Sequence, residues 1–463
     1  MKISKILLLL FFINSSFILL SQEIGGGEFK FNKSKTECLT ASQREKIVKK
    51  LKQSQEKLKL ENKLLNSNSQ IPNPLFIWPV KKASSVTHNE IWAISSYVDH
   101  NPAYPNKLTD YNGGKKSYDT SSGYNHQGID IYTWPYYWKM MDDNGLEVIA
   151  ASGGQIIYKN DGEYDRSCDT NNNPWNAVYI MHNDGSVAWY GHLKNGSLTT
   201  KNIGDTVTRG EYLGIVGSSG NSIGPHLHFE VYEDDTYDYN KLIDPYNGPS
   251  NNWNNISWWE TQKPYRNPKI NALTTNSNPP DFGDCPSSEI TNEKNIFSTN
   301  ELVYFIVFLK DQFGQNFDLK VYKPDNSISL SWNRNLTEDY ASSYWFYTGY
   351  VDIEGQWRLE CTLSTGEIIN HYFTVDNSLN TNKYLLNKTT IYPNPLNENL
   401  FINSKTRINK LIVRDVLGKR IFVNKDKFIG TKKLPVNFLS KGLYFLTILD
   451  ENSNSITLKI LKK

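Results

Sequence analysis

Along most of the chain, short runs of hydrophobic residues alternate with short polar segments, a pattern typical of β-strands rather than helices. Between residues 148 and 231 the apolar runs are three to five residues long, and Gly, Asn and Asp separate them. These runs predict an antiparallel β domain over residues 75–250. Its predicted strands lie at residues 148–151, 154–158, 177–181, 187–190, 214–216 and 227–231.

One segment, residues 40–66, has a helical pattern and contains no Pro or Gly. Pro72 and Pro74 end this helical region. Residues 22–74 therefore form either a solvated linker helix or a pro-segment. Apolar positions fit a heptad seam with two polar interruptions: Val48, Leu51, Leu58 and Leu65, interrupted by Gln55 and Asn62.

Two further β modules follow the first domain. Residues 251–282 are rich in Asn, Pro and Trp and indicate a linker. Residues 283–376 have the pattern of an immunoglobulin-like β-sandwich. After an Asn-rich linker at 377–388, residues 389–463 predict a small β-sandwich. The strand-like runs of these two modules are 303–308, 319–322, 355–361, 391–395, 411–415 and 442–448. The fold class is thus mainly β with an N-terminal helix.

The N-terminus has the features of a secretory signal peptide, residues 1–21. Lys2 and Lys5 precede a short apolar run, which polar residues interrupt before it resumes. The alternative, a membrane anchor, is disfavoured because the stretch is broken and no basic residues follow it. No other segment approaches the ~20 apolar residues of a membrane helix. We expect a secreted or cell-surface chain with no transmembrane segment after removal of the signal.

Charge is distributed unevenly, although the net charge is only +2. Residues 40–66 carry eight Lys/Arg and three Glu, a net +5, and residues 78–250 carry twelve against twenty-one Asp/Glu, a net −9. Residues 377–463 carry sixteen against five, a net +11. A nucleic-acid-binding protein would place basic residues on its working domain, so no nucleic acid is expected. One hypothesis is that the +5 segment lies across the −9 domain and blocks its site until cleaved.

The four cysteines are few but even in number, and an exported chain could pair them. Cys285 and Cys361 fall at opposite ends of the second module and are the better candidate pair. Cys38 and Cys168 have no assigned partner. Spacing alone does not establish a disulfide.

Candidate metal chemistry lies in His126, Asp130, His226 and His228. Gly128 and the branched residues beside it favour a strand, on which residues two or four apart point to one face. Two imidazoles and a carboxylate form the ligand set of a hydrolytic Zn²⁺ site with a vacant position for water. That water would have a pKa near ~7 and would attack a polarised carbonyl. No His-Glu-x-x-His string occurs, so a histidine is the natural general base.

Three strings of this region, His126 to Asp130, Gly191-His192-Leu193 and His226 to His228, resemble those of one enzyme family. This is the family of lysostaphin and LytM-type zinc endopeptidases, the glycyl-glycine or β-lytic metallopeptidases. The resemblance covers about residues 75–248 and implies an antiparallel sheet of the duplicated hybrid motif type. It implies His126, Asp130 and His228 as zinc ligands, with His192 and His226 as the catalytic pair. Insertions at 99–124 and 160–174 could form the rims of a substrate groove and leave specificity open.

Two other strings have more than one interpretation. The aromatic run at residues 132–138 either packs in the core, which we favour, or stacks on substrate. The Ser/Gly run at 217–224 lacks the Lys of a nucleotide-binding loop. It indicates a flexible wall that brings backbone N–H groups near the substrate.

The C-terminal residues 389–463 resemble the C-terminal sorting domain of type IX secretion cargo in Bacteroidetes. The matching strings are residues 392–395, 413–419 and 441–445. The resemblance implies export through the periplasm and across the outer membrane, with the type IX machinery as a partner. The alternative is an ordinary adhesive β module.

The sequence as a whole predicts a secreted zinc metalloendopeptidase that hydrolyses peptide bonds in peptidoglycan cross-links or Gly-rich proteins. A non-catalytic wall-binding protein or adhesin is the alternative from another class, supported by the aromatic content and the two accessory modules. A third interpretation is an activator of another wall hydrolase. Which bond is cut, in whose wall, and in which oligomeric state are left open.

Overall fold

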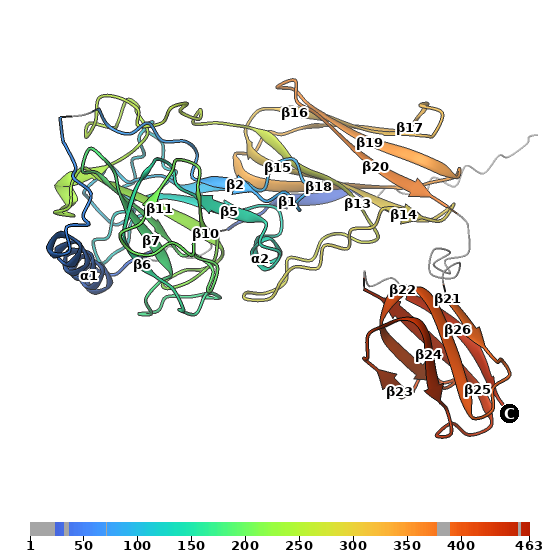
Figure 1. Cartoon of the computed structure of the whole chain (residues 1–463). Helices are drawn as coiled ribbons and strands as arrows, with labels where there is room; N and C mark the ends of the chain where they lie inside the picture. The colour runs from blue at the N-terminus through green and yellow to red at the C-terminus, as the bar shows by residue number, and fades with distance from the viewer. Residues whose placement is uncertain (1–23, 32–36, 71, 377–388, 452–454) are drawn as a thin grey trace, which may run out of the picture. The chain divides into compact units, whose positions relative to one another are not determined.

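The computed structural model describes residues 24–31, 37–70, 72–376, 389–451 and 455–463. The predicted signal peptide and the 377–388 linker lie outside these ranges. The chain divides into two units, Met1–Val375 and Asp376–Lys463. The described residues are mainly β with an N-terminal helix, as predicted (Figure 1). None of the helices in these ranges has the length and apolarity that crossing a membrane requires.

An eight-stranded sheet forms the centre of the predicted zinc domain. Strand β11 lies between β4 and β8 and is antiparallel to both. In spatial order the sheet contains β3 (Trp92–Ser96), β4 (Ile129–Thr133), β11 (His226–Tyr232), β8 (Val187–Gly191), β7 (Ala177–Met181), β6 (Gly154–Asn160) and β9 (Thr206–Val207), with β12 (Leu242–Ile243) paired to β11. The predicted strands of this domain are therefore confirmed, apart from shifts of a few residues at their ends.

Side-chain alternation on β11 separates the core from the polar face. Leu227, Phe229 and Val231 are buried in the main apolar cluster of the domain. Their neighbours His226, His228 and Glu230 must then point to the opposite face of the sheet. A three-stranded sheet contributes to the same cluster: β10 (Tyr212–Ile215), β5 (Leu146–Ile149) and β2 (Val80–Lys82). The short elements α2 (Tyr137–Asp142) and η1 (Tyr239–Lys241), which no pattern predicted, complete the domain.

The N-terminal segment contains a strand as well as the expected helix. Strand β1 (Ile24–Glu28) pairs with a strand of the second module. Helix α1 (Ala41–Leu60) begins at a Thr40 capping box and packs along β6 (Figure 1). Two seam positions, Leu51 and Leu58, are fully buried in this contact. Gln55, which interrupts the seam, is also buried and accepts a hydrogen bond from the Tyr237 hydroxyl at 3.0 Å.

The second module consists of two sheets that share one apolar core. The first contains β1, β18 (Tyr340–Tyr350), β15 (Leu302–Gln312) and β13 (Lys269–Asn276). The second contains β14 (Ile296–Phe297), β20 (Ile368–Val375), β19 (Gly355–Leu363), β16 (Asn316–Tyr322) and β17 (Ile328–Asn335). The segment 251–282 is thus more than the predicted linker, because it contains the residues that form β13. The apolar run of this strand is short and is flanked by Asn and Thr, so the sequence pattern did not predict it. The immunoglobulin-like topology stays a prediction.

The aromatic run at 132–138 packs, as favoured from the sequence. Tyr132, Trp134 and Tyr136 are fully buried against Ile306 and Phe308 of β15. The Trp134 indole Nε1–H donates to the Leu309 carbonyl oxygen at 3.1 Å. These rings join the zinc domain to the second module, so they are not a surface for substrate stacking.

The third module, in the second unit, is a six-stranded sheet with its own apolar core. The long strand β22 pairs with four others. The strands are β21 (Thr389–Tyr392), β22 (Asn399–Arg414), β23 (Arg420–Asn424), β24 (Phe428–Pro435), β25 (Gly442–Asp450) and β26 (Ser455–Lys462). The predicted strand at 442–448 lies within β25, and the predicted strand at 411–415 overlaps the end of β22, which ends at Arg414.

The predicted Cys285–Cys361 disulfide is wrong. Cys285 pairs with Cys168, with 5.8 Å between their Cα atoms. Cys361 lies in β19 with its side chain in the core between the two sheets of the second module, where it is fully buried and free. The insertion at 160–174 carries Cys168 to the second module, a tertiary contact that spacing along the chain does not reveal. Cys38 is also free and buried.

Candidate metal centre

Strand pairing brings the predicted ligands together on the polar face of the sheet. His228 lies opposite Asp130 of β4 and opposite Gly191 of β8. Side chains directly opposite on antiparallel strands are immediate neighbours. His126 precedes β4 rather than lying within it, so the predicted strand covers only the second half of this string. The loop nevertheless turns the His126 ring into the same cluster.

Three ligand atoms converge in this cluster. The His228 Nδ1 atom lies 2.9 Å from Asp130 Oδ1 and 3.3 Å from His126 Nε2. The His126 Nε2 atom lies 3.1 Å from Asp130 Oδ2. All three residues are buried, with exposed fractions of at most 3 %. A polar cluster this close and this dry requires a cation or shared protons to stabilise it.

The hydrogen bonds at the far side of each ring set the tautomers required for metal binding. A carbonyl oxygen only accepts, so the His126 Nδ1–H donates to the Tyr97 carbonyl at 2.8 Å. The His228 Nε2–H donates to the Glu230 carboxylate at 2.9 Å. His126 Nε2 and His228 Nδ1 therefore keep their lone pairs for a metal. This donor set of two nitrogens and one carboxylate fits Zn²⁺.

His192 and His226 flank this cluster and lie next to each other, with 4.3 Å between ring centroids. The His192 Nδ1–H donates to the Ser219 carbonyl at 2.6 Å, and the His226 Nδ1–H donates to the Gly224 carbonyl at 2.8 Å. Both Nε2 atoms are left for chemistry in the site. The His192 Nε2 atom is buried and has no hydrogen-bond partner among the described residues.

The Ser/Gly run at 217–224 supports both imidazoles. It offers the carbonyl oxygens of Ser219 and Gly224 to them, and the approach of its N–H groups to a substrate stays a prediction. Its own side chains are buried and bonded: the Ser218 and Ser222 hydroxyls lie 2.8 Å apart, and the Ser219 hydroxyl donates to the Leu193 carbonyl at 2.9 Å. The structure places the five predicted site residues in two adjoining groups, one with His126, Asp130 and His228 and the other with His192 and His226.

Two regions of the chain match known protein families. Residues 124–245 match the model of peptidase family M23, and residues 390–463 match that of the secretion system C-terminal sorting domain. The chain contains an M23 peptidase domain. Both predicted resemblances are confirmed, and both matched ranges lie within the predicted domains.

The alignments with individual curated relatives cover a small part of each chain. The DD-carboxypeptidase/endopeptidase Mpg of Neisseria meningitidis serogroup B is 38% identical over 107 residues, 23% of this chain and 20% of the relative. The glycyl-glycine endopeptidase ALE-1 of Staphylococcus capitis is 32% identical over 110 residues, 24% of this chain and 25% of the relative. The solved catalytic domain of lysostaphin from Staphylococcus simulans is 26% identical, with a TM-score of 0.21 over 28% of this chain and 83% of that domain. The chain spans about a quarter or less of these curated relatives' length.

Electrostatics of the M23 domain agree with a cation site. Burial lowers the pKa of His126, but the Asp130 carboxylate outweighs burial and raises the pKa to about 9. Burial raises the pKa of Asp130, yet the His126 imidazole holds it below its usual range. Without a metal, an imidazolium and a carboxylate therefore balance each other at neutral pH. A divalent cation replaces the imidazolium proton.

Two glycines of the M23 domain admit the rings of the site. A Cβ atom on Gly128 would lie 2.6 Å from the His228 ring, and one on Gly191 would lie 2.4 Å from the Trp175 ring. Trp175 in turn packs edge-on against His192, with ring centroids 4.9 Å apart. Any side chain at these two positions would push the site apart. The close approach of the His228 and Trp175 rings to the backbone explains why glycine occupies these two positions.

Glu230 is a supporting residue of the site to which the sequence interpretation assigned no role. It accepts from His228 and forms a buried ion pair with Arg44 of helix α1. Burial raises the pKa of Glu230, but the Arg44 guanidinium outweighs burial and lowers the pKa to about 2. Its position two residues after His228 on a strand was the available signal, because it shares the face of the ligand. A carboxylate behind a ligand histidine orients the ring and strengthens the ligand.

We predict that Glu230→Gln weakens zinc binding 10–100-fold, roughly the cost of losing such a supporting carboxylate. Competition with a chromophoric chelator measures the dissociation constant. Glu233→Gln is the matched control, because Glu233 is exposed and pairs with Lys241 on the surface. Equal zinc affinity in both variants would show that Glu230 does not support the site.

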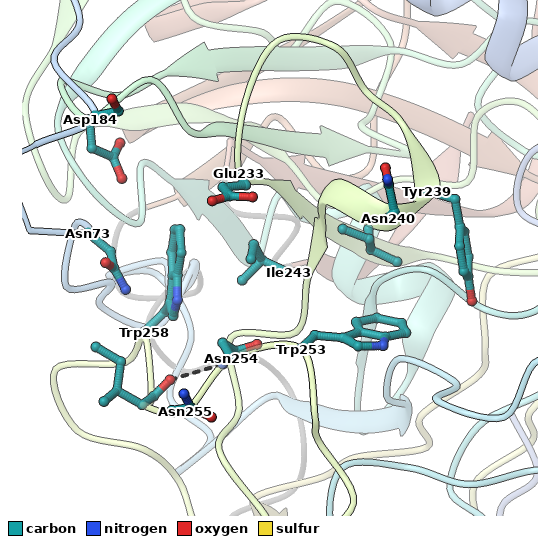
Figure 2. Close-up of a pocket in the computed structure, with 13 residues that line it drawn as sticks. Asn73, Asp184, Glu233, Tyr239, Asn240, Ile243, Trp253, Asn254, Asn255 and Trp258 are labelled. Carbon is teal, nitrogen blue, oxygen red and sulfur yellow. Dashed lines mark hydrogen bonds between the residues drawn. The ribbon is translucent and has the colours of Figure 1, made fainter.

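A larger cavity, of about 710 Å³, shares no lining residue with the metal centre. Figure 2 shows Trp253, Trp258 and Tyr239 around it, together with Asn and acidic side chains. Residues Ser69 and Asn73 of the N-terminal segment form part of its lining. Beside Asp130 and His226 only about 10 Å³ of space is left, in a cavity lined in part by Phe31 and Cys38. That is room for roughly one water molecule, so a peptide does not enter the metal centre of this form of the chain.

Proposed function

We propose that this chain is a secreted zinc metalloendopeptidase whose ligands are His126, Asp130 and His228. The observation that carries the proposal is the convergence of His126 Nε2, His228 Nδ1 and the Asp130 carboxylate within 3.3 Å of one another. Far-side hydrogen bonds hold both imidazoles in the ligating tautomer. When bound, zinc supplies Lewis acidity for attack on a carbonyl.

His192 is the proposed general base. Burial and the neighbouring His226 lower its pKa, so the imidazole is neutral near pH 7. Its Nδ1 proton is engaged with Ser219, which leaves the Nε2 lone pair to take a proton from the attacking water and return it to the leaving amine. His192 has a left-handed backbone with φ 62°, a costly conformation that tends to occur at functional sites.

His226 is the proposed oxyanion-stabilising group. Burial lowers its pKa, but the Asp130 carboxylate outweighs burial and raises it. Because the Nδ1–H is held by Gly224, the proton that His226 gains on protonation lies on Nε2, and this second N–H donates into the site. A donor in this buried position stabilises the negative charge that develops on a carbonyl oxygen. The two imidazoles thereby divide proton transfer and charge stabilisation between them.

Peptidoglycan cross-links are the proposed substrate class. Support comes from the curated relatives, which are named as a glycyl-glycine endopeptidase and a DD-carboxypeptidase/endopeptidase. The matched sorting domain supports export through the type IX secretion system to the cell surface or the medium. The second module, over the proposed range 283–376, is proposed to be an immunoglobulin-like accessory domain. Gly-rich proteins remain the second candidate substrate.

A panel of defined substrates tests this proposal. The zinc-loaded full chain, intact and after limited proteolysis, is incubated with cross-linked muropeptide dimers, pentaglycine-bridged dimers and an elastin peptide. We expect chelator-sensitive cleavage of a muropeptide dimer and no cleavage of elastin. Cleavage of elastin alone would replace the proposed substrate class. One zinc per chain with no cleaved substrate would favour the wall-binding or activator alternative.

A further inference from the structure

Cys38 lies inside the metal centre, although it is 88 residues from the nearest ligand in the sequence. A cluster in which each residue's ligating atom lies within 4.8 Å of the others contains Cys38, His126, Asp130 and His228. A second such cluster contains Cys38 with His192 and His226. We propose that the Cys38 thiolate is the fourth zinc ligand while the N-terminal segment is attached, and that it holds the peptidase latent. This inference rests on the proposed function of the same site.

The chemistry of the donor set supports Cys38 as a ligand. Two nitrogens and one carboxylate leave one tetrahedral position open in a hydrolytic zinc site, and a closed site has four protein ligands. Thiolate is among the preferred ligands of zinc. Cys38 is 4 % exposed, and its Sγ atom lies 2.7 Å from the Tyr118 hydroxyl. The His192 Nε2 atom lies in the same pocket and is buried without a hydrogen-bond partner among the described residues, so the pocket has an unused polar atom.

The residues around Cys38 fill the space that a substrate would need. Phe31 stacks on Tyr132 with ring centroids 4.4 Å apart and packs edge-on against His226 at 5.7 Å. A Cβ atom on Gly224 would lie 3.1 Å from the Phe31 ring. Phe31 and Cys38 together reduce the free space beside Asp130 to about 10 Å³.

Residues of the three predicted groove walls hold this segment in place. From the insertion at 99–124, the Thr120 hydroxyl donates to Glu37 Oε1 at 3.2 Å. From the insertion at 160–174, the Asn173 carbonyl accepts from Gln43 Nε2 at 2.8 Å. From the Ser/Gly run, the Asn221 amide donates to the Glu37 carbonyl. The segment therefore occupies the groove that these loops border.

The contact between helix α1 and the M23 domain differs from the electrostatic docking that the charge map suggested. Among the described residues, one ion pair joins them, between Arg44 and Glu230. The buried residues of α1 are Gln43, Leu51, Gln55 and Leu58. Apolar packing and hydrogen bonds therefore dock the helix, and Arg44 places the segment directly behind His228.

Latency and its release follow as a ligand exchange. On metal binding, the Cys38 S–H bond loses its proton to solvent and the thiolate occupies the fourth position. Once a processing protease has hydrolysed a peptide bond between Cys38 and the M23 domain, the segment would leave with its sulfur, and the fourth position would be open to a water molecule from solvent. No oxidant or reductant takes part, and the other three ligands are unchanged.

X-ray absorption at the zinc edge of the native full-length chain tests this ligand directly. We expect one sulfur neighbour at about 2.3 Å, the usual zinc–thiolate distance. The same spectrum from full-length Cys38→Ser should contain only nitrogen and oxygen neighbours. Tyr118→Phe is the matched control, since it removes the hydroxyl beside Cys38 Sγ and leaves the thiol, so its spectrum should keep the sulfur. A native spectrum without a sulfur neighbour overturns the proposal. This result comes from the native chain alone and does not depend on whether a variant folds.

Hydrolysis assays of the same samples separate this proposal from the proposed function. Cys38→Ser removes the sulfur that anchors the segment to zinc, so the segment should leave the groove in a larger fraction of molecules. We therefore expect zinc-loaded Cys38→Ser to cleave a muropeptide dimer at least 10-fold faster than the native chain. Native activity equal to that of Cys38→Ser would overturn latency. A sulfur neighbour in the native chain, together with zinc-loaded Cys38→Ser that is inactive both intact and after limited proteolysis, would contradict the peptidase and leave the ligand assignment in place. An active enzyme whose native spectrum contains no sulfur neighbour would support the peptidase and contradict Cys38 as a ligand.

Discussion

His228→Ala is expected to remove zinc from the chain and to lower peptide-bond hydrolysis by about 10³-fold or more. His228 contributes the central ligand atom, 2.9 Å from Asp130 and 3.3 Å from His126. Losing one of three protein ligands also leaves Glu230 and Asp130 buried without their shared partner. A metal contributes several kcal/mol of transition-state stabilisation, and ~4 kcal/mol corresponds to about 10³-fold in rate.

Metal analysis and muropeptide hydrolysis, both in the Cys38→Ser background, measure this effect. His371→Ala is the matched control, because His371 lies in the second module and bonds to Thr275. The control should keep one zinc per chain and full activity. Full zinc content in His228→Ala would show that the ligand assignment is wrong.

His192→Ala is expected to retain zinc and still lose about 10²–10⁴-fold in turnover, the usual contribution of a general base. Its Nδ1 is committed to the Ser219 carbonyl, and its Nε2 is free of partners among the described residues. The ring therefore transfers protons without being one of the three ligands. The comparison requires zinc content and turnover on the same preparation. Loss of zinc equal to that of His228→Ala would make His192 a ligand instead.

The pH dependence of turnover gives this assignment a second test. Burial and His226 lower the pKa of His192 below the usual ~6.5 of an imidazole. The base is therefore half protonated only at a pH below ~6.5. The decline of turnover toward acid pH should have its midpoint below pH ~6.5. A rate that declines between pH 8 and 7 would contradict a neutral buried base.

Periodicity was enough to predict the sheet and the face of its ligands, because side chains on a strand alternate strictly. His226 and His228 lie on one face of β11 while Leu227 and Phe229 fill the core. The partner strand of β11 could not be read from periodicity alone. The resemblance to zinc endopeptidases supplied the ligand set, and the register that places His228 opposite Asp130 agrees with that set.

Tertiary contacts between distant segments were beyond the reach of local pattern. The Cys168–Cys285 disulfide joins an insertion loop to a different module across 117 residues. Likewise, Cys38 reaches the ligands of a domain that begins about forty residues later. The charge map did indicate that the N-terminal segment meets the M23 domain. It could not show that a thiol, an aromatic ring and one ion pair make the contact, since net charge carries no information on geometry.

The most direct measurement of the central claim is mass spectrometry of purified peptidoglycan sacculi after incubation with zinc-loaded, full-length Cys38→Ser. Parallel samples contain a chelator or the Cys38→Ser/His192→Ala double variant. The proposed mechanism predicts new amino and carboxyl termini at one type of cross-link bond, in the first sample only. Intact cross-links in the presence of enzyme with one bound zinc per chain would contradict it.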